Sequence, residues 1–389
     1  MSRAAVRDGF VPPPYPHDRL DDLRAIAESA PGGIVDASVG TPVDPTPEMV
    51  VQAATAALRD ATGYPATIGS GAFRDAAAGW MQRRFGVTVS PDAVVACIGT
   101  KEVVAGLPRL LSLRDPGRDT VLYPALSYPT YAMGSTLAGL RAVPVPVDDA
   151  WHPDVSSVDA EDVARALVLW CNDPANPTGV GSSAAGLGAT VEWARAHGIV
   201  VASDECYAEF TCDEHGDPAA PVTALAGDHD GVLAVHSLSK RSNMAGFRIG
   251  FVAGDAELVG YLGEVRKHAG MMSAAPTQAA AVAALGDDAH VDEQRARYAR
   301  RRAAALPALE RFGLVHDGGP STFYLWLRSA HDDAADGWAI AARLARAGVL
   351  VAPGDLYGAA GGRHVRLALT LTDAQVEQMI EDLDRDGSS

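Results

Sequence analysis

Seven short apolar runs, separated by stretches with helical periodicity, constrain the fold of this chain most strongly. Their alternation predicts an α/β fold, in which the strands form one mostly parallel sheet with helices between them. The last two runs are separated by only 10 residues, fewer than the dozen or more that a parallel crossover needs. We therefore expect one antiparallel strand in an otherwise parallel sheet of about seven strands. The expected strands are residues 94–98, 120–123, 142–147, 167–171, 199–203, 232–237 and 248–253.

The last third of the chain has a different pattern. Beyond residue 258 it becomes helical, with a long helix expected across 288–312. Residues 323–327 and 364–369 then read as strands, with a Pro- and Gly-containing stretch at 349–358 between them. These segments predict a smaller α+β domain. We expect an N-terminal arm and part of the small domain in 1–45, a large domain in 46–275 and the rest of the small domain in 276–389.

Lys240 follows directly after one of the expected strands, where α/β folds place their chemistry. Two hydroxyls, Ser237 and Ser239, precede it, and Arg248 follows eight residues later between two glycines. Hydroxyls and a guanidinium suit a phosphate, and glycines allow close backbone approach. An amine beside such a cradle indicates a Schiff-base lysine that holds a phosphorylated aldehyde cofactor. Taken alone, a lysine after a strand is more often a solvated loop residue.

Polar residues also follow two earlier strands. Asn176 lies in the tight turn Asn-Pro-Thr-Gly, and Asp204 comes directly after a buried run. A carboxylate there is costly to bury unless it is paired, and the protonated nitrogen of a pyridine ring would pair with it. The spacings are 28 residues from Asn176 to Asp204, 36 from Asp204 to Lys240, and 8 from Lys240 to Arg248. The first two are about one βα unit each.

These motifs in this order resemble the pyridoxal 5′-phosphate (PLP) aminotransferases of the aspartate aminotransferase superfamily, fold type I. The resemblance covers about residues 30–380 and implies PLP as the cofactor, amino acids and 2-oxo acids as substrates, and a homodimer with shared active sites. It implies that Lys240 is the catalytic residue, which holds PLP and moves the proton at the substrate Cα. Asp204 would pair with the ring nitrogen, and Asn176 and Tyr207 would hydrogen-bond the phenolic oxygen.

The same resemblance implies roles for residues that are ordinary by themselves. The helix start Gly-Thr-Lys-Glu, with Thr100 as its expected N-cap, would bind the cofactor phosphate against the amides of Lys101 and Glu102. Thr100, Ser237, Ser239 and Arg248 would also bind the cofactor. Tyr128 would stack on the ring. Tyr64 would reach the phosphate of the neighbouring subunit. Gly40 would lie near the substrate carboxylate, Asn176 would contact the substrate, and Arg366 would be the fork that binds its α-carboxylate.

Composition narrows the class of partners. The net charge of −17 argues against nucleic acid or an anionic membrane as the main partner. The four cysteines have no metal spacing and apolar neighbours, which favours a reducing compartment. The N-terminus has no apolar signal core, and no stretch reads as a membrane span. We expect a cytoplasmic protein without metal or nucleic acid.

The run after Lys240, Arg241-Ser242-Asn243, resembles the N-succinyldiaminopimelate aminotransferases of bacterial lysine biosynthesis. We therefore expect amino transfer between N-succinyl-LL-2,6-diaminopimelate and 2-oxoglutarate or glutamate. An aminotransferase of aromatic, aspartate or kynurenine specificity, and a PLP-dependent C–S β-lyase, would keep every residue named above. A non-enzymatic regulator would need a basic DNA-binding module, for which residues 1–45 are too short and insufficiently basic. A metalloenzyme would need clustered His and Cys ligands, which the sequence lacks.

Overall fold

The computed structural model describes residues 10–387 of the chain. Its main feature is a sheet of seven strands in the order β2-β8-β7-β6-β5-β3-β4. Strand β8 is antiparallel to both neighbours, and the remaining pairs are parallel, so the expected single antiparallel strand is confirmed. The strands are β2 (Val94–Cys97), β3 (Thr120–Pro124), β4 (Arg141–Val145), β5 (Ala166–Asn172), β6 (Val200–Asp204), β7 (Val232–Ser237) and β8 (Gly250–Gly254).

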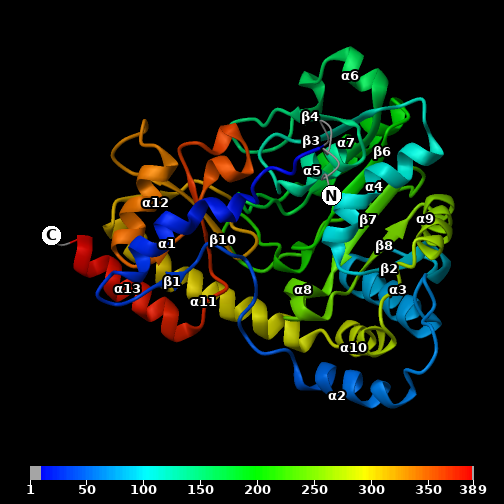
Figure 1. Ribbon diagram of the computed structural model, residues 1–389, viewed down its shortest axis with the longest axis horizontal. Coiled ribbons are helices and arrows are strands. Elements are labelled where there is room, and N and C mark those ends of the chain that lie inside the picture. The colour runs from blue at the N-terminus through cyan, green and yellow to red at the C-terminus, as the bar shows by residue number, and fades with distance from the viewer. Residues whose placement is uncertain (1–9, 388–389) are drawn as a thin grey trace, which may run out of the picture.

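Helices cover both faces of this sheet (Figure 1), which explains why its central strands are apolar on both sides. One core lies between the sheet and α4 (Thr100–Arg114), α5 (Thr130–Leu137) and α9 (Ala256–His268). The core on the other face is formed with α2 (Glu48–Ala57), α3 (Gly71–Phe85), α6 (Ala160–Arg165), α7 (Ala184–Ala196) and α10 (Ala275–Gly286). The short α8 (Leu238–Arg241) lies in the connection from β7 to β8.

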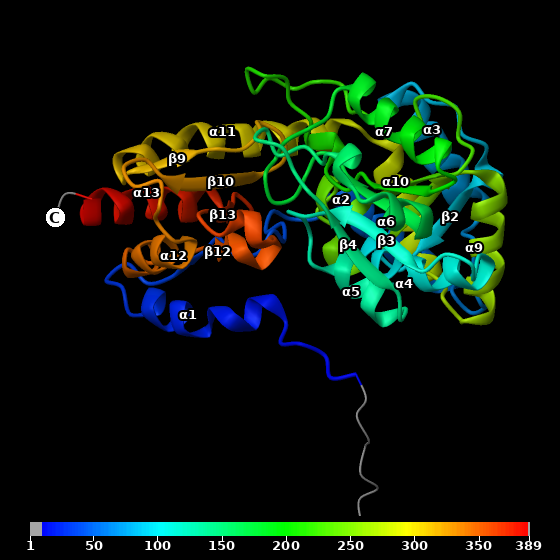
Figure 2. The same cartoon turned by 90° about the horizontal axis from the view of Figure 1, so that it is seen from above.

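A smaller part of the molecule is built from both ends of the chain (Figures 1 and 2). Its four-stranded antiparallel sheet has the order β12-β13-β10-β9, and β1 near the N-terminus pairs in parallel with β11 near the C-terminus. A separate hydrophobic core fills this part. Its elements are α1 (Asp21–Glu28), β1 (Val35–Asp36), α11 (Ala289–Arg311), β9 (Leu314–His316), β10 (Tyr324–Ser329), α12 (Gly337–Arg346), β11 (Val349–Leu350), β12 (Ala352–Pro353), β13 (Val365–Ala368) and α13 (Asp373–Gly387).

The predicted segments differ from the observed ones mainly at their ends. The described part of the N-terminal arm contains a 3₁₀ turn, η1 (Pro16–Leu20), which begins at Pro16 and continues directly into α1. The division at residues 45 and 275 stays a prediction, and residues 1–9 of the N-terminal arm and 388–389 lie outside the described part of the chain. Within residues 10–387, no helix combines the length and the apolar character that a membrane crossing requires.

Candidate active site

A cavity of about 500 Å³ lies where the main sheet meets the smaller part of the molecule. The carboxyl ends of β5, β6 and β7 and the start of α4 form one side, and residues near β1, β10 and β13 form the other. Every predicted site residue lines this cavity except Tyr64 and Glu102. Those that do are Gly40, Thr100, Lys101, Tyr128, Asn176, Asp204, Tyr207, Ser237, Ser239, Lys240, Arg248 and Arg366.

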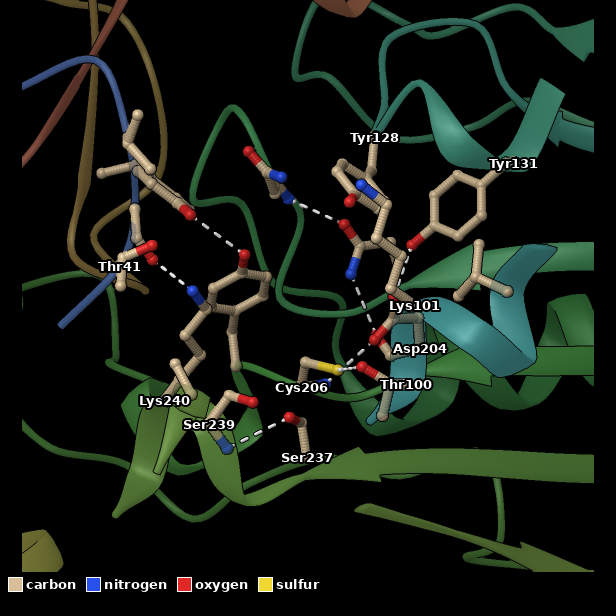
Figure 3. A pocket seen from close by; sticks show the side chains of 18 of the residues that line it. Thr41, Thr100, Lys101, Tyr128, Tyr131, Asp204, Cys206, Ser237, Ser239 and Lys240 are labelled. Carbon is tan, nitrogen blue, oxygen red and sulfur yellow. Dashed lines mark hydrogen bonds between the residues drawn. The ribbon is translucent and has the colours of Figure 1, made fainter. Parts of the chain in front are cut away.

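Lys240 enters the cavity from α8, directly after β7 (Figure 3). Its ammonium donates a hydrogen bond to the Gly40 carbonyl and has no carboxylate partner among residues 10–387. Burial lowers the pKa of this amine to about 8, and the Arg366 and Arg248 guanidinium groups act in the same direction. The chain has two other lysines, 101 and 267. The lowered pKa makes Lys240 the lysine best suited to react as a neutral amine.

Asp204, at the end of β6, is only 6% exposed. Its carboxylate accepts hydrogen bonds from the Tyr131 hydroxyl at 2.8 Å and the Cys206 amide at 3.2 Å, but no cation within the described residues pairs with it. Burial raises the pKa of this carboxyl. A protonated ring nitrogen would supply the missing positive charge and favour the ionised form. The carboxylate therefore fits the role that the sequence predicts for it.

The predicted phosphate cradle lies beside the start of α4. Ser237, Ser239 and Arg248 line this end of the cavity, and the Ser237 hydroxyl accepts the Ser239 amide at 3.1 Å. Arg248 has a left-handed backbone with φ of 51° and lies so close to Gly99 that a Cβ at residue 99 would overlap the guanidinium. Hydroxyl donors, a guanidinium and a helix N-terminus together match the chemistry of a phosphate group.

The expected N-cap at Thr100 is wrong. Gly99 is the N-cap, with φ of 73°, and Thr100 is the first helical residue. The left-handed φ of residue 99 favours glycine, and the Arg248 guanidinium packs where a Cβ would lie. The Thr100 hydroxyl instead contacts the Cys206 sulfur at 3.2 Å.

Glu102 does not reach the cavity with its side chain. Its carboxylate pairs with Arg266 and accepts the Ile98 amide at 3.2 Å, and its own amide donates to the Gly99 carbonyl. The Glu102 side chain therefore fastens α4 to α9. A contact of its backbone with the phosphate stays a prediction.

Three side chains surround the place predicted for the cofactor ring. Tyr128 lines the cavity, and its ring packs edge-on against Tyr131 with centroids 6.1 Å apart. The Tyr207 hydroxyl shares a hydrogen bond with the Tyr324 hydroxyl at 3.0 Å. The Asn176 oxygen accepts Arg366 at 2.8 Å, which leaves the Asn176 NH₂ group free to donate to a phenolic oxygen.

Arg366 is buried in β13 and lies between the rings of Tyr324 and Tyr357, with centroids 4.2 and 4.8 Å from its guanidinium carbon. Besides Asn176, it donates to the Ser38 carbonyl at 2.7 Å. No carboxylate within residues 10–387 pairs with it. A buried guanidinium that is held by neutral groups and faces a cavity is an anion-binding group. It fits the predicted role of holding a substrate carboxylate.

Tyr64 lies outside the cavity of its own chain and is 97% exposed. Such exposure of a large aromatic residue is expected if another subunit covers it. Its predicted contact with a partner's cofactor, and the dimer itself, stay predictions.

The side chains of the run after Lys240 lie outside the cavity. Arg241 is buried and pairs with Glu209 at 3.3 Å, and it also donates to the Ala284 carbonyl. Asn243 donates to Pro45 and to Gln294. These side chains do not line the cavity. They connect α8 to surrounding elements.

Sequence reasoning missed several residues that line the cavity. The Tyr131 hydroxyl donates a hydrogen bond to Asp204, and the Tyr324 hydroxyl shares one with the Tyr207 hydroxyl. Two further lining residues, Tyr15 and His17, come from the N-terminal segment. Tyr131 lies in a Tyr-Pro-Thr-Tyr run after β3, and this was its only signal. The N-terminal residues have no motif around them.

We expect Tyr131→Phe to weaken the hold on Asp204. A hydrogen bond to a charged group contributes about 1.5–3 kcal/mol, so kcat/KM for amino transfer should fall about tenfold or more. Tyr261→Phe is a matched control, because that hydroxyl donates to the Leu110 carbonyl outside the cavity. Equal activity of the two variants would show that the Tyr131 hydroxyl does not support Asp204.

Comparison with known proteins agrees with this geometry. Residues 33–383 match the family Aminotransferase class I and II. The chain is 47% identical to the probable aminotransferase Rv1178 of Mycobacterium tuberculosis, over 94% of this chain and 83% of that protein. It is 44% identical to the 4-dedimethylamino-4-oxo-anhydrotetracycline transaminase OxyQ of Streptomyces rimosus, over 94% and 97%. An LL-diaminopimelate aminotransferase of Desulforudis audaxviator is 35% identical over 95% of each chain.

A solved structure shows the same fold. The probable N-succinyldiaminopimelate aminotransferase of Thermus thermophilus superposes with a TM-score of 0.83 and 29% identity, over 95% of this chain and 98% of that one. The cavity presents a buried carboxylate, a lysine with a lowered pKa and a set of phosphate-binding groups, which together fit PLP. The chain therefore belongs to the class I and II aminotransferases, the transaminases that use pyridoxal 5′-phosphate as their cofactor.

Proposed function

We propose that this chain transfers an amino group between N-succinyl-LL-2,6-diaminopimelate and 2-oxoglutarate or glutamate, a reaction of lysine and diaminopimelate biosynthesis. The observation that carries the proposal is that two cations other than Lys240 and Arg248 line the cavity. Arg366 is buried, and Lys101 lies at the mouth without a carboxylate partner among residues 10–387. Each proposed substrate has an α-carboxylate and at least one further carboxylate, so each can pair with both cations.

The side chains of the chain can perform the proton transfers of this reaction. When bound, PLP supplies a ring that withdraws electrons from the Cα–H bond of the substrate. Arg366 holds the α-carboxylate, and Asn176 supports Arg366 through their hydrogen bond of 2.8 Å. Lys240 takes the proton from Cα as a general base and later returns a proton as a general acid, for which a pKa of about 8 is favourable at neutral pH. Asp204 would stabilise positive charge on the ring nitrogen.

Relatives support the substrate only in part. LL-diaminopimelate aminotransferases and the Thermus thermophilus protein are similar to this chain over most of its length, and their names refer to diaminopimelate or its succinyl derivative. The Arg241-Ser242-Asn243 run adds no support, because it does not line the cavity. The dimer with Tyr64 in the partner's site and a cytoplasmic location remain part of this proposal.

A second candidate is amino transfer to a large cyclic ketone. The observation in its favour is the 44% identity to OxyQ over nearly the whole of that protein. The cavity of about 500 Å³ is of a size that holds small organic ligands. A ketone without carboxylates would leave both Arg366 and Lys101 unpaired, which makes this candidate the weaker one.

A half-reaction distinguishes these functions. The purified PLP-loaded enzyme is mixed with N-succinyl-LL-diaminopimelate, glutamate or an aromatic amino acid, and the cofactor absorbance is followed. Conversion with the succinylated donor and glutamate, but not with the aromatic one, supports the proposal. Conversion with another donor only would exclude N-succinyl-LL-diaminopimelate as the substrate, and the transaminase activity would still stand. Release of ammonia and pyruvate from an added amino acid that carries a C–S bond at Cβ, without an oxo acid, would instead identify a β-lyase.

We expect Arg366→Gln to raise KM for every amino donor by about tenfold or more, because it removes a charged hydrogen-bond donor to the α-carboxylate. KM and kcat are measured in the same half-reaction. Arg328→Gln is the control, since Arg328 lies in the neighbouring strand β10 and pairs with Asp317 and Asp333. An unchanged KM in the Arg366 variant would assign the α-carboxylate to a different group.

A further inference from the structure

The two ring nitrogens of His17 are buried polar atoms that the reaction described above does not use. His17 lies in η1, and the N-terminal segment enters the smaller part of the molecule on the side that faces the main sheet (Figure 2). The ring lines the cavity, and neither of its nitrogens has a hydrogen-bond partner in the protein. Nearly all buried polar atoms in native proteins have a partner, and leaving one unpaired is costly. The two nitrogens are therefore available to a molecule that occupies the cavity.

The surroundings of His17 are aromatic and positively charged. The ring of Tyr15 stacks on it with centroids 5.6 Å apart and an interplanar angle of 23°. The Lys101 ammonium donates to the Tyr15 hydroxyl at 3.2 Å and lies 4.8 Å from the Tyr15 ring centroid. Arg366 lies near enough to act on His17 electrostatically. A ligand in this part of the cavity can therefore contact the cations Lys101 and Arg366 and form a hydrogen bond with the His17 ring.

The protonation state of His17 follows from the same surroundings. Burial lowers the pKa of this imidazole, and Arg366 and Lys101 lower it further. The Ser38 carbonyl and Asp36 act in the opposite direction, but neither ring nitrogen of His17 makes a hydrogen bond to them. A neutral imidazole has one N–H donor and one acceptor. It can therefore donate one hydrogen bond to an anion without requiring a proton from solvent.

We propose that His17 is a specificity-determining residue, whose ring N–H donates a hydrogen bond to a carboxylate on the side chain of the substrate, next to Lys101. This inference rests on the proposed function. Arg366 already holds the α-carboxylate, so the part of the cavity around His17 is left for the rest of the substrate. The chain then favours amino acids with an acidic side chain over apolar ones of the same length. Both 2-oxoglutarate and a succinylated donor have such a carboxylate.

The test compares His17→Phe and His17→Gln in the PLP-loaded enzyme. Glutamate and norvaline are the donors, because they share the α-amino acid group and differ in the distal carboxylate. We expect His17→Phe to raise KM for glutamate about tenfold, with kcat changed less than about threefold and norvaline unaffected, since only one hydrogen bond to a charged group is lost. His17→Gln should recover part of the loss, because its amide can donate. His331→Phe is the control, since His331 is exposed.

A binding measurement makes the test independent of turnover. Glutarate and pentanoate, which do not react, are titrated into the same proteins while the cofactor absorbance is followed. We expect His17→Phe to weaken glutarate binding about tenfold and to leave pentanoate binding unchanged. Equal losses for both ligands, or no loss for glutarate in a variant with an unchanged melting temperature, overturn the inference. A wild-type enzyme that binds glutarate but transfers no amino group from any donor would reject the proposed function and leave the His17 subsite standing.

Discussion

Lys240→Ala abolishes amino transfer, with kcat reduced by about 10⁴-fold, the upper end of what a positioned acid–base group contributes. The reason is that Lys240 is the one lysine in the cavity with a lowered pKa, about 8, and no carboxylate partner among residues 10–387. The variant should also lose the absorbance of the lysine-linked cofactor. Single-turnover mixing with glutamate measures the rate, and an absorbance spectrum measures the linkage.

The matched control is Lys267→Ala, since Lys267 is 62% exposed and pairs with Glu264 at the surface.

The pH dependence of the free energy of unfolding gives an independent check on Lys240. The ordinary pKa of a lysine is 10.5, and that of folded Lys240 is about 8, so the unfolded chain binds more protons between these pH values. The contribution of Lys240 to the free energy of unfolding therefore rises with pH across this window. Lys240→Ala should flatten that rise. Retained amino transfer in the variant would refute the assignment.

Asp204→Asn lowers kcat by about 10²–10⁴-fold, because removing one partner of a buried ion pair costs about 3–5 kcal/mol. In the unliganded chain, burial raises the pKa of Asp204. The positive charge of the cofactor ring nitrogen would lower the pKa of the Asp204 carboxyl again. Asparagine has no negative charge and therefore cannot form this ion pair. Asp204→Glu keeps the charge and should recover part of the activity. The measurement is kcat in the half-reaction with saturating cofactor.

Asp173→Asn is the control for this prediction. Asp173 is another buried carboxylate, it lies just after β5, and burial raises its pKa to about 6. It accepts the Ser182 amide at 2.9 Å and does not line the cavity. Its substitution should change the melting temperature more than kcat. If the two variants lost the same fraction of kcat, the loss at Asp204 would be a general effect of disturbing a buried carboxylate.

The sequence allowed most of the large sheet to be predicted, because its buried strands are apolar runs, and the central strands β5, β6 and β7 end in the polar residues Asn172, Asp204 and Ser237. The short connection before β8 was sufficient to predict its antiparallel direction. The placement of Lys240, Asp204 and Asn176 in one cavity followed, since the carboxyl ends of parallel strands share one edge. The role of Arg366 as a carboxylate-binding residue could be predicted only by family resemblance. Arg366 lies in a strand of four residues, and the sequence of that strand does not show which cavity the side chain faces.

Other parts of the site depend on contacts between distant segments. Tyr131 and Asp204 are 73 residues apart, and Tyr207 and Tyr324 are 117 apart, so no local pattern predicts either pair. Thr100 was expected as an N-cap because hydroxyls favour that position, but Gly99 is the N-cap, with a left-handed φ of 73° that favours glycine. The Arg241 side chain pairs with Glu209 behind α8, although the neighbouring Lys240 points into the cavity. Adjacent residues of a short helix face different directions, which a motif cannot show.

Locating the bound cofactor tests the central claim most directly. The PLP-loaded enzyme is reduced with borohydride, which makes the bond between cofactor and lysine permanent, and is then digested and analysed by mass spectrometry. The chain has only three lysines, Lys101, Lys240 and Lys267, so the result is unambiguous. We expect the pyridoxyl group on the peptide that contains Lys240 and on no other. A pyridoxyl group on Lys101, which also lines the cavity, would contradict the account and require a different active centre.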